Sequence, residues 1–373
     1  MGSPGDSPAA SGTIGTMGSP GDSPTAKTDR YNSERDECGP ADVTQEVVKA
    51  ITVEEQPRSV TGHSVASVDG RILVFGGSDA ESVLRQVQVL KPEAADDGKG
   101  SVSMCWSPAP SMLSRRVYSS AVVMDNKVYV LGGSADGRVL NTIEIFDPQE
   151  WSWQQWYCLP PMLTRRTMHA AAVDNGHRIY VCGGFDGMRD SKTVERFDST
   201  TNQWRRVADM SCGRSYLATV CSAKGIFAIG GQDRLGTEDQ DRAHDSVEFF
   251  DLYSESWREK PPMAKRRIGV AGALLLDDDD NEQIYACGGS DGTTVLDSVE
   301  RFDTATETWS FAPSLNFPRL GHCCAVLDNV LHVIGGYDGK DPVDCVERLS
   351  VAQDKWIVVP MDREAINHLD ARP

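Results

Sequence analysis

The sequence predicts an all-β chain that folds as a six-bladed β-propeller, and three observations support this fold class. Six Gly-Gly pairs recur along the chain, at 76–77, 132–133, 183–184, 230–231, 288–289 and 335–336. In five units an acid or amide follows the pair at one constant spacing, as Gln88, Glu144, Glu195, Glu300 and Glu347. In four units a tryptophan follows at a second constant spacing, as Trp153, Trp204, Trp309 and Trp356. Radial repetition of four-stranded sheets gives a propeller with one blade per unit.

Each unit divides into four short runs rich in β-branched and aromatic residues, which predict four antiparallel strands. The fifth unit shows them clearly, at 269–276, 283–289, 298–303 and 309–313. The first strand of each unit is rich in small residues, which suits the crowded centre of a propeller. The aromatic residues and the repeat tryptophans are expected to fill the space between neighbouring blades. The first unit departs most from the pattern, because the stretch 91–105 delays its fourth strand, but we still expect a blade.

The order of landmarks in each unit resembles the kelch repeat. These landmarks are an arginine, a small-residue strand, aromatic-x-x-Gly-Gly, the run V-E-R-F-D and a tryptophan, and they extend over about 58–361. The segment GGYDGKDPVDCVERL at 335–349 resembles the kelch-like substrate adaptors of cullin ubiquitin ligases in particular. The resemblance implies a propeller that binds proteins and has no catalytic activity of its own.

The chain divides into four parts on this basis. Residues 1–43 are a Ser/Pro/Gly-rich tail. Such a tail has too little apolar surface to offset the entropy of ordering, so we expect disorder. Residues 44–57 form an entry strand or linker, 58–361 the propeller, and 362–373 a C-terminal tail. The N-terminal part is too short for a BTB domain and too polar for an F-box, so a link to a cullin ligase is expected to need a separate protein.

Composition narrows the classes of partner. The formal net charge is −18, and such a field opposes binding to nucleic acid or to anionic lipid. No window of the sequence is apolar enough to span a membrane, and the N-terminus lacks a signal peptide. We therefore expect a cytoplasmic or nuclear protein with protein partners. The ten cysteines include no C-x-x-C pair and are expected to pack as small apolar residues.

The sequence predicts no catalytic residue, no metal site and no cofactor. The seven histidines are scattered, and none belongs to an H-x-x-x-H motif. The acidic run Asp277–Asp280 carries oxygen ligands that a divalent cation accepts, although a solvated hairpin loop is the more common explanation of such a run.

The candidate binding site lies at one end of the predicted channel. An arginine precedes the first strand of every unit, and these starts should fall on one face, around the channel mouth. Guanidinium groups suit bidentate recognition of carboxylates and phosphates. By position, the resemblance to kelch-like adaptors implies that they grip acidic or phosphorylated peptides together with polar and aromatic residues of the loops after the Gly-Gly pairs. The candidates are Arg58, Arg116, Arg166, Arg214, Arg267, Arg319, Phe185, Gln232, Ser290 and Tyr337.

Two alternatives stay open at this level. The arginines could instead serve the scaffold, by pairing with loop aspartates such as Asp186, Asp291 and Asp338. The protein itself is expected to be an interaction scaffold, with substrate recognition for ubiquitin ligation as its narrower form. The alternative is a propeller enzyme that acts on a small ligand in the channel, such as a sugar epimerase.

Overall fold

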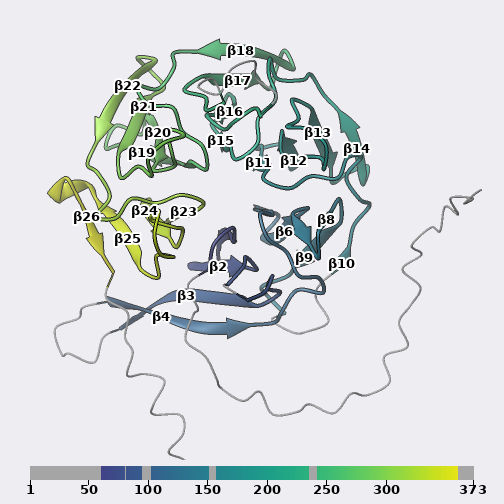
Figure 1. Cartoon of the computed structure of the whole chain (residues 1–373), viewed down its shortest axis with the longest axis horizontal. Helices are drawn as coiled ribbons and strands as arrows, with labels where there is room; N and C mark the ends of the chain where they lie inside the picture. The colour runs from purple at the N-terminus through teal and green to yellow at the C-terminus, as the bar shows by residue number, and fades with distance from the viewer. Residues whose placement is uncertain (1–59, 80, 95–101, 151–156, 235–241, 360–373) are drawn as a thin grey trace, which may run out of the picture. The chain divides into compact units, whose positions relative to one another are not determined.

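Six four-stranded antiparallel sheets stand around a central channel, so the predicted six-bladed propeller is confirmed (Figure 1). The computed structural model describes residues 60–79, 81–94, 102–150, 157–234 and 242–359. All of these belong to a compact unit of residues 55–373. The predicted disordered tail, the entry segment and the C-terminal tail lie outside the described residues. In the part of the chain that is described, no helix is long and apolar enough to cross a membrane.

The strands of each blade run from the channel outwards. The innermost strands are β1 (Ser64–Val68), β5 (Ser120–Met124), β11 (Ala170–Val173), β15 (Ala218–Cys221), β19 (Ala271–Leu276) and β23 (Cys323–Leu327). The second strands are β2 (Arg71–Phe75), β6 (Lys127–Leu131), β12 (Arg178–Cys182), β16 (Gly225–Ile229), β20 (Glu282–Cys287) and β24 (Val330–Ile334). The third strands are β3 (Val87–Ala94), β9 (Ile143–Phe146), β13 (Val194–Asp198), β17 (Val247–Asp251), β21 (Val299–Asp303) and β25 (Val346–Ser350). The outermost strands are β4 (Val102–Ala109), β10 (Tyr157–Cys158), β14 (Gln203–Arg206), β18 (Ser256–Lys260), β22 (Thr308–Ala312) and β26 (Lys355–Val358).

Two small elements complete the description. A hairpin of β7 (Ser134–Ala135) and β8 (Arg138–Val139) extends the loop after the second Gly-Gly pair. A 3-10 turn, η1 (Val351–Gln353), joins β25 to β26. The stretch that delays the fourth strand of the first unit forms a longer hairpin, because β3 pairs with β4 over Val87–Ala94 and Val102–Ala109.

Each blade takes its four described strands from one continuous segment of the chain. The ring is closed between the sixth and first blades by side chains. There Ile72, Val74 and Leu90 of the first blade share an apolar cluster with Ala325 and Ile334 of the sixth. Within the described residues, therefore, no strand from either terminus is exchanged between blades to close the propeller.

The repeat tryptophans that the structure describes join neighbouring blades, as expected, whereas Trp153 lies outside the described residues. Trp204 of β14 packs on Phe197 with ring centroids 5.3 Å apart and donates its indole N–H to Pro160 O of the preceding blade at 3.0 Å. The same hydrogen bond recurs between three further pairs of blades, at 2.9 Å in each. The donors are Trp257, Trp309 and Trp356. Burying an aromatic ring and satisfying its polar tip explains why the unit keeps this residue.

The Gly-Gly pair allows close approach of the next blade. Gly132 has a φ of +55°, and a β-carbon at this position would lie 2.6 Å from the carbonyl oxygen of Arg166. The second glycine, Gly133, donates its N–H to that same carbonyl at 2.8 Å. Glycine is required here because any side chain would separate the two blades.

Candidate functional site

One face of the propeller carries the loops that follow the Gly-Gly pairs and the segments that lead from each outermost strand to the next innermost strand. We call it the ring face. The two sets of loops are joined by single β-bridges, for example Val117 with Ser134 and Leu320 with Tyr337. The hairpins between the first and second strands and between the third and fourth strands open on the opposite face.

Arg166 shows what the repeated arginine does. Its side chain has no exposed surface, and its guanidinium group donates to Gly183 O at 2.7 Å, Thr193 O at 2.8 Å and Thr193 Oγ1 at 2.6 Å. It also pairs with Glu195 Oε1 at 2.8 Å, and this carboxylate is equally buried. The other oxygen of Glu195 accepts the backbone N–H of Leu163, in the segment that leads to the arginine. The pair therefore locks the ring-face segment onto the second and third strands of its blade.

The same arrangement recurs in five blades, with nitrogen–oxygen distances of 2.8 to 2.9 Å. The pairs are Arg116–Glu144, Arg166–Glu195, Arg214–Glu248, Arg267–Glu300 and Arg319–Glu347. These five guanidinium groups were expected around the channel mouth, and that expectation is wrong. They are buried inside the blades, each beside the equally buried partner that a buried charge needs. The expected scaffold partners were also wrong, since the loop aspartates hold their own turns, as when Asp186 accepts the N–H groups of Met188 and Arg189.

The first blade lacks this ion pair. In the second blade the residue after the arginine, Val117, forms a β-bridge with Ser134. In the first blade the equivalent bridge joins Thr61 to Ser78, so the residue before it, Val60, stands where the other blades have the arginine. Arg58 lies outside the described residues, and it is two positions away from the equivalent site. Gln88 stands in β3 where the other blades have glutamate. The first blade therefore has neither the cation nor the carboxylate. The two are lost together because a buried carboxylate without its cation is strongly destabilising.

The four predicted loop residues do lie on the ring face. Phe185, Gln232, Ser290 and Tyr337 each follow a Gly-Gly pair, make the equivalent bridge and are half-buried. Phe185 lies under the guanidinium group of Arg234, which is 4.9 Å from the ring centroid. These positions are thus accessible to a partner, whereas the five arginines are not.

A second ring of residues, which the sequence analysis did not identify, surrounds the channel mouth. Its six members share a left-handed backbone, with φ between 54° and 65°. Five of them donate the backbone N–H to the carbonyl oxygen of the equivalent residue in the preceding blade, at 2.6 to 3.3 Å. The members are Gly62, Tyr118, Met168, Tyr216, Gly269 and Gly321. The sequence does contain a signal for this left-handed ring, because three of the six units have glycine at this position.

A pocket of about 480 Å³ opens beside this ring. Its walls include Tyr118, Tyr216, Ile268, Leu320 and Tyr337. The rings of Tyr118 and Tyr216 meet edge to face at 5.5 Å and 80°. Burial raises the pKa of the Tyr216 hydroxyl, so this group stays protonated at neutral pH.

The histidines near the mouth belong to the scaffold. His63, His169 and His322 are buried, and their rings lie against the first glycine of a neighbouring blade's Gly-Gly pair. Burial lowers the pKa of His63 to about 4 and that of His169 and His322 to about 3. Each is therefore a neutral packing group.

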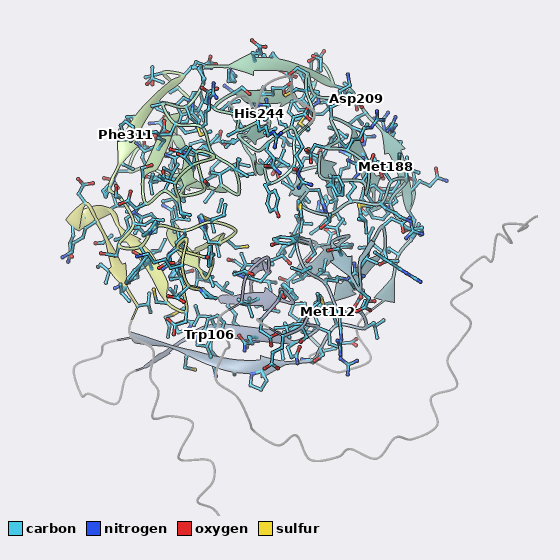
Figure 2. All side chains as sticks on the ribbon, in the orientation of Figure 1. Trp106, Met112, Met188, Asp209, His244 and Phe311 are labelled. Carbon is cyan, nitrogen blue, oxygen red and sulfur yellow. The ribbon has the colours of Figure 1, made fainter. Side chains whose placement is uncertain are left out.

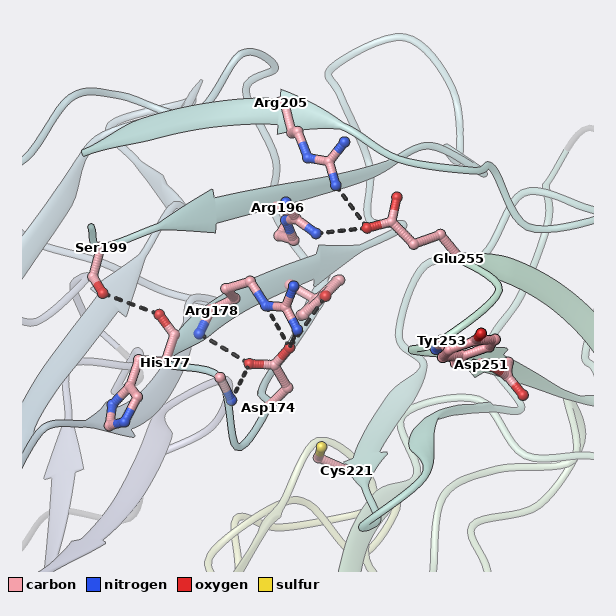
Figure 3. A network of polar contacts seen from close by, with 12 residues as sticks. Asp174, His177, Arg178, Arg196, Ser199, Arg205, Cys221, Asp251, Tyr253 and Glu255 are labelled. Carbon is pink, nitrogen blue, oxygen red and sulfur yellow. Dashed lines mark hydrogen bonds and ion pairs between the residues drawn. The ribbon is translucent and has the colours of Figure 1, made fainter. Parts of the chain in front are cut away.

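The opposite face carries polar links between blades. Glu255, in the β17–β18 turn, binds Arg196 and Arg205 of the third blade at 2.7 Å each, while Asp174 accepts the Nε–H of Arg178 at 2.8 Å (Figure 3). The contacts of Glu255 brace the third blade against the fourth.

The run Asp277–Asp280 also lies on the opposite face, in the turn between β19 and β20. Asp277 there accepts the N–H groups of Asp279 and Asn281 within its own turn. Among the described residues, no group of histidine, cysteine, aspartate and glutamate side chains is arranged to hold a metal ion.

The comparisons with known proteins agree with this architecture. The family model for the KLHDC2/KLHL20/DRC7 Kelch-repeats domain matches residues 41–231, just over half of the chain, and the Kelch motif matches 213–264, 280–316 and 318–360. The chain belongs to the kelch-repeat family. Kelch-like protein 23 of Homo sapiens is 29% identical over 276 residues, which are 72% of this chain and 44% of that protein. Kelch-like protein 26 of Danio rerio is 26% identical over 74% of this chain and 43% of that protein.

This kelch-repeat chain spans less than half the length of those curated relatives. Among solved structures, YjhT is similar with a TM-score of 0.65 at 17% identity, covering 82% of this chain and 98% of that one. At that identity the likeness concerns the fold alone.

Proposed function

We propose that this kelch propeller is a non-catalytic interaction module that binds partner proteins on its ring face. One observation carries the proposal. The six loops after the Gly-Gly pairs have the same bridged backbone, yet the side chains at the equivalent position are not constant: three blades have serine, and the other three have phenylalanine, glutamine and tyrosine. These are Ser78, Ser134, Phe185, Gln232, Ser290 and Tyr337. A constant frame with variable side chains is how loops on a rigid scaffold achieve recognition.

Two sets of ionisable side chains that could serve catalysis have a role in the scaffold instead. The repeated arginines and glutamates neutralise each other inside the blades, and the three histidines beside the mouth are buried and neutral. The narrower proposal is substrate recognition for a cullin ubiquitin ligase, through a separate protein. It rests on the resemblance of 335–349 to such adaptors and on the match to kelch-like proteins.

The test compares the two faces by proximity labelling in cells. The ring-face variant combines Phe185→Ala and Tyr337→Ala. The control is Tyr253→Ala in the β17–β18 turn, because Tyr253 is 99% exposed on the opposite face. We expect the ring-face variant to lose the labelled partners and the control to keep them. Partners that survive the ring-face changes but disappear with Tyr253→Ala would refute the proposal, and a cullin among the ring-face partners supports the narrower one.

A further inference from the structure

Two backbone hydrogen bonds recur on the ring face wherever one blade meets the next, with one exception. In the first bond, the second glycine of a Gly-Gly pair donates its N–H to the carbonyl oxygen of the next blade's repeated arginine, at 2.7 to 2.8 Å. In the second bond, the left-handed residue at the channel mouth donates to its counterpart in the preceding blade, at 2.6 to 3.3 Å. The exception is the contact between the sixth and first blades, which we call the closing seam. Among the described residues it has neither bond.

The open bond at the channel mouth leaves a donor and an acceptor unpaired. Gly62 of the first blade is buried, and within the described part of the chain its N–H has no acceptor. Its counterpart in the sixth blade is Gly321, whose carbonyl oxygen receives no hydrogen bond from the described residues. A buried backbone N–H is nearly always paired with protein, water or a ligand. Both glycines line the pocket of about 480 Å³, so a ligand in that pocket lies beside both groups.

Elsewhere the closing seam is well packed, and the first and sixth blades are neighbours in Figure 1. A β-carbon at Gly335 of the sixth blade would lie 2.6 Å from Cε1 of His63 of the first. The thiol of Cys323 donates to His63 O at 3.1 Å, and Ile334 shares an apolar cluster with Ile72. The two blades are therefore in firm contact, and the missing hydrogen bonds concern only their edge on the ring face.

Much of the pocket wall is apolar or aromatic. Ile268 and Leu320 supply aliphatic side chains, and Tyr118, Tyr216 and Tyr337 supply rings. Tyr118 and Tyr216 have left-handed backbones that bulky residues rarely adopt, and such strain is concentrated at binding sites. In Figure 2, side chains of the third and fourth blades project toward the central opening. An apolar side chain that enters the pocket would be stabilised by burial against this wall.

We propose that the closing seam binds an extended segment of the partner protein through the backbone of that segment. A residue in an extended chain presents its N–H and C=O on the same side, as in a hydrogen-bonded pair of an antiparallel sheet. One partner residue therefore donates to Gly321 O and accepts from the N–H of Gly62, which completes the ring of hydrogen bonds. Main-chain bonds supply the affinity, and the wall selects an apolar side chain on the segment. This inference rests on the proposed function, since it specifies how the ring face holds its partner.

The first measurement is amide hydrogen exchange of the native protein, followed residue by residue in the NMR spectrometer. In the free protein we expect the N–H of Gly62 to exchange faster than those of Tyr118 and Gly269, because these two are hydrogen-bonded to the preceding blade. The probe is the capped pentapeptide Gly-Gly-Leu-Gly-Gly. Its addition should slow the exchange of Gly62 and leave that of Gly269 unchanged.

Two analogues of this peptide separate recognition of the backbone from recognition of the side chain. In one, an ester replaces the amide of the leucine N–H and so removes the donor to Gly321 O. In the other, asparagine replaces leucine and supplies a polar side chain of similar shape. The loss of one hydrogen bond predicts that the ester peptide binds roughly 2- to 12-fold more weakly than the amide peptide in NMR titrations. The asparagine peptide should also bind more weakly than the leucine peptide, because the wall is apolar.

Two protein variants with the same substitution locate the site. Gly321→Met copies Met168, the counterpart in the third blade, and places a side chain at the seam. A β-carbon at Gly321 meets no atom within 4 Å, and φ is +64°. The matched control is Gly70→Met, in the exposed turn between β1 and β2 on the opposite face, where φ is +68° and the space is equally open. We expect Gly321→Met to lose the leucine peptide and Gly70→Met to bind it as the native protein does, with similar thermal midpoints. If Gly321→Met unfolds, hydrogen exchange and the ester peptide decide.

Several results would overturn the proposal. Exchange of Gly62 as slow as that of Tyr118 in the free protein would show that the ring is closed in solution. Equal affinity for the amide and ester peptides would reject recognition of the backbone, and equal affinity for leucine and asparagine would reject the apolar side chain. Equal binding by the two methionine variants would place the peptide elsewhere. If no peptide binds at millimolar concentration while the ring-face variant still loses its labelled partners in cells, the seam proposal is wrong and the proposed function stands.

Discussion

The buried ion pair of the third blade allows a decisive test of what the repeated arginine does. Replacing Arg166 by valine, the residue of the first blade at this place, removes four hydrogen bonds and leaves Glu195 charged, buried and without a cation. An uncompensated buried charge costs about 3–5 kcal/mol, out of a total stability of about 5–15 kcal/mol for a folded domain. We therefore expect a loss of at least about 3 kcal/mol in the free energy of unfolding.

Two further variants serve as comparisons for Arg166→Val. Arg165→Val changes the adjacent arginine, which is exposed and donates one hydrogen bond to Val139 O. Because a surface substitution of this kind has little effect, we expect it to cost about 0.5 kcal/mol or less. The double variant Arg166→Val with Glu195→Gln copies both residues of the first blade and removes the stranded charge. It should be more stable than Arg166→Val alone, by about 1–2 kcal/mol, because the amide needs no counter-charge.

The assay is urea unfolding followed by tryptophan fluorescence, on the native protein and the three variants. If Arg166→Val is no less stable than Arg165→Val, the arginine is not a scaffold group, and the burial argument is refuted. If the double variant is as unstable as the single one, the cost comes from the lost hydrogen bonds and cavity, and not from the carboxylate charge.

Two further predictions concern the scaffold. His169→Leu copies Leu217 of the fourth blade. Burial lowers the pKa of His169 to about 3. Below about pH 6.5 the imidazole is therefore protonated in the unfolded chain but stays neutral in the folded protein, so the free energy of unfolding falls as the pH drops. The native protein should therefore lose about 2 kcal/mol more than this variant between about pH 6.5 and pH 5, and parallel urea-stability curves would contradict this. Trp204→Ala removes a ring that packs on Phe197 and donates to Pro160 O. It should cost about 3–5 kcal/mol in urea unfolding, and a cost below about 1 kcal/mol would contradict the packing role.

The repeat made the fold predictable from sequence. Each landmark has a local physical reason to recur: the Gly-Gly pair permits close approach of the next blade, and the tryptophan fills the space beside the preceding one. Six such units leave little choice of architecture. The second strand expected in the fifth unit, over 283–289, corresponds to the observed β20 (Glu282–Cys287).

The site was predictable only in part, and the repeated arginine shows why. Sequence spacing revealed both Arg166 and Glu195 as landmarks of their unit. It did not reveal that they meet, because contact across that separation depends on how β13 pairs with β12. An arginine at a strand start has the same sequence signal whether it faces solvent or a buried carboxylate. The positions of Phe185 and Tyr337 were predictable, since a loop directly after Gly-Gly must emerge on a known face.

By itself the sequence determined the number of blades, the order of strands and the face on which each loop emerges, because these follow from local periodicity and turn chemistry. Only the tertiary structure decided which side chains are accessible there. Burial and charge compensation depend on neighbours that are far apart in the chain. Arg116 and Arg319 are buried beside their glutamates for this reason. Hydrogen bonds between blades hold Tyr118 and Tyr216 at the channel mouth. The repeat motif therefore supplies the frame, and residues outside that motif form the pocket.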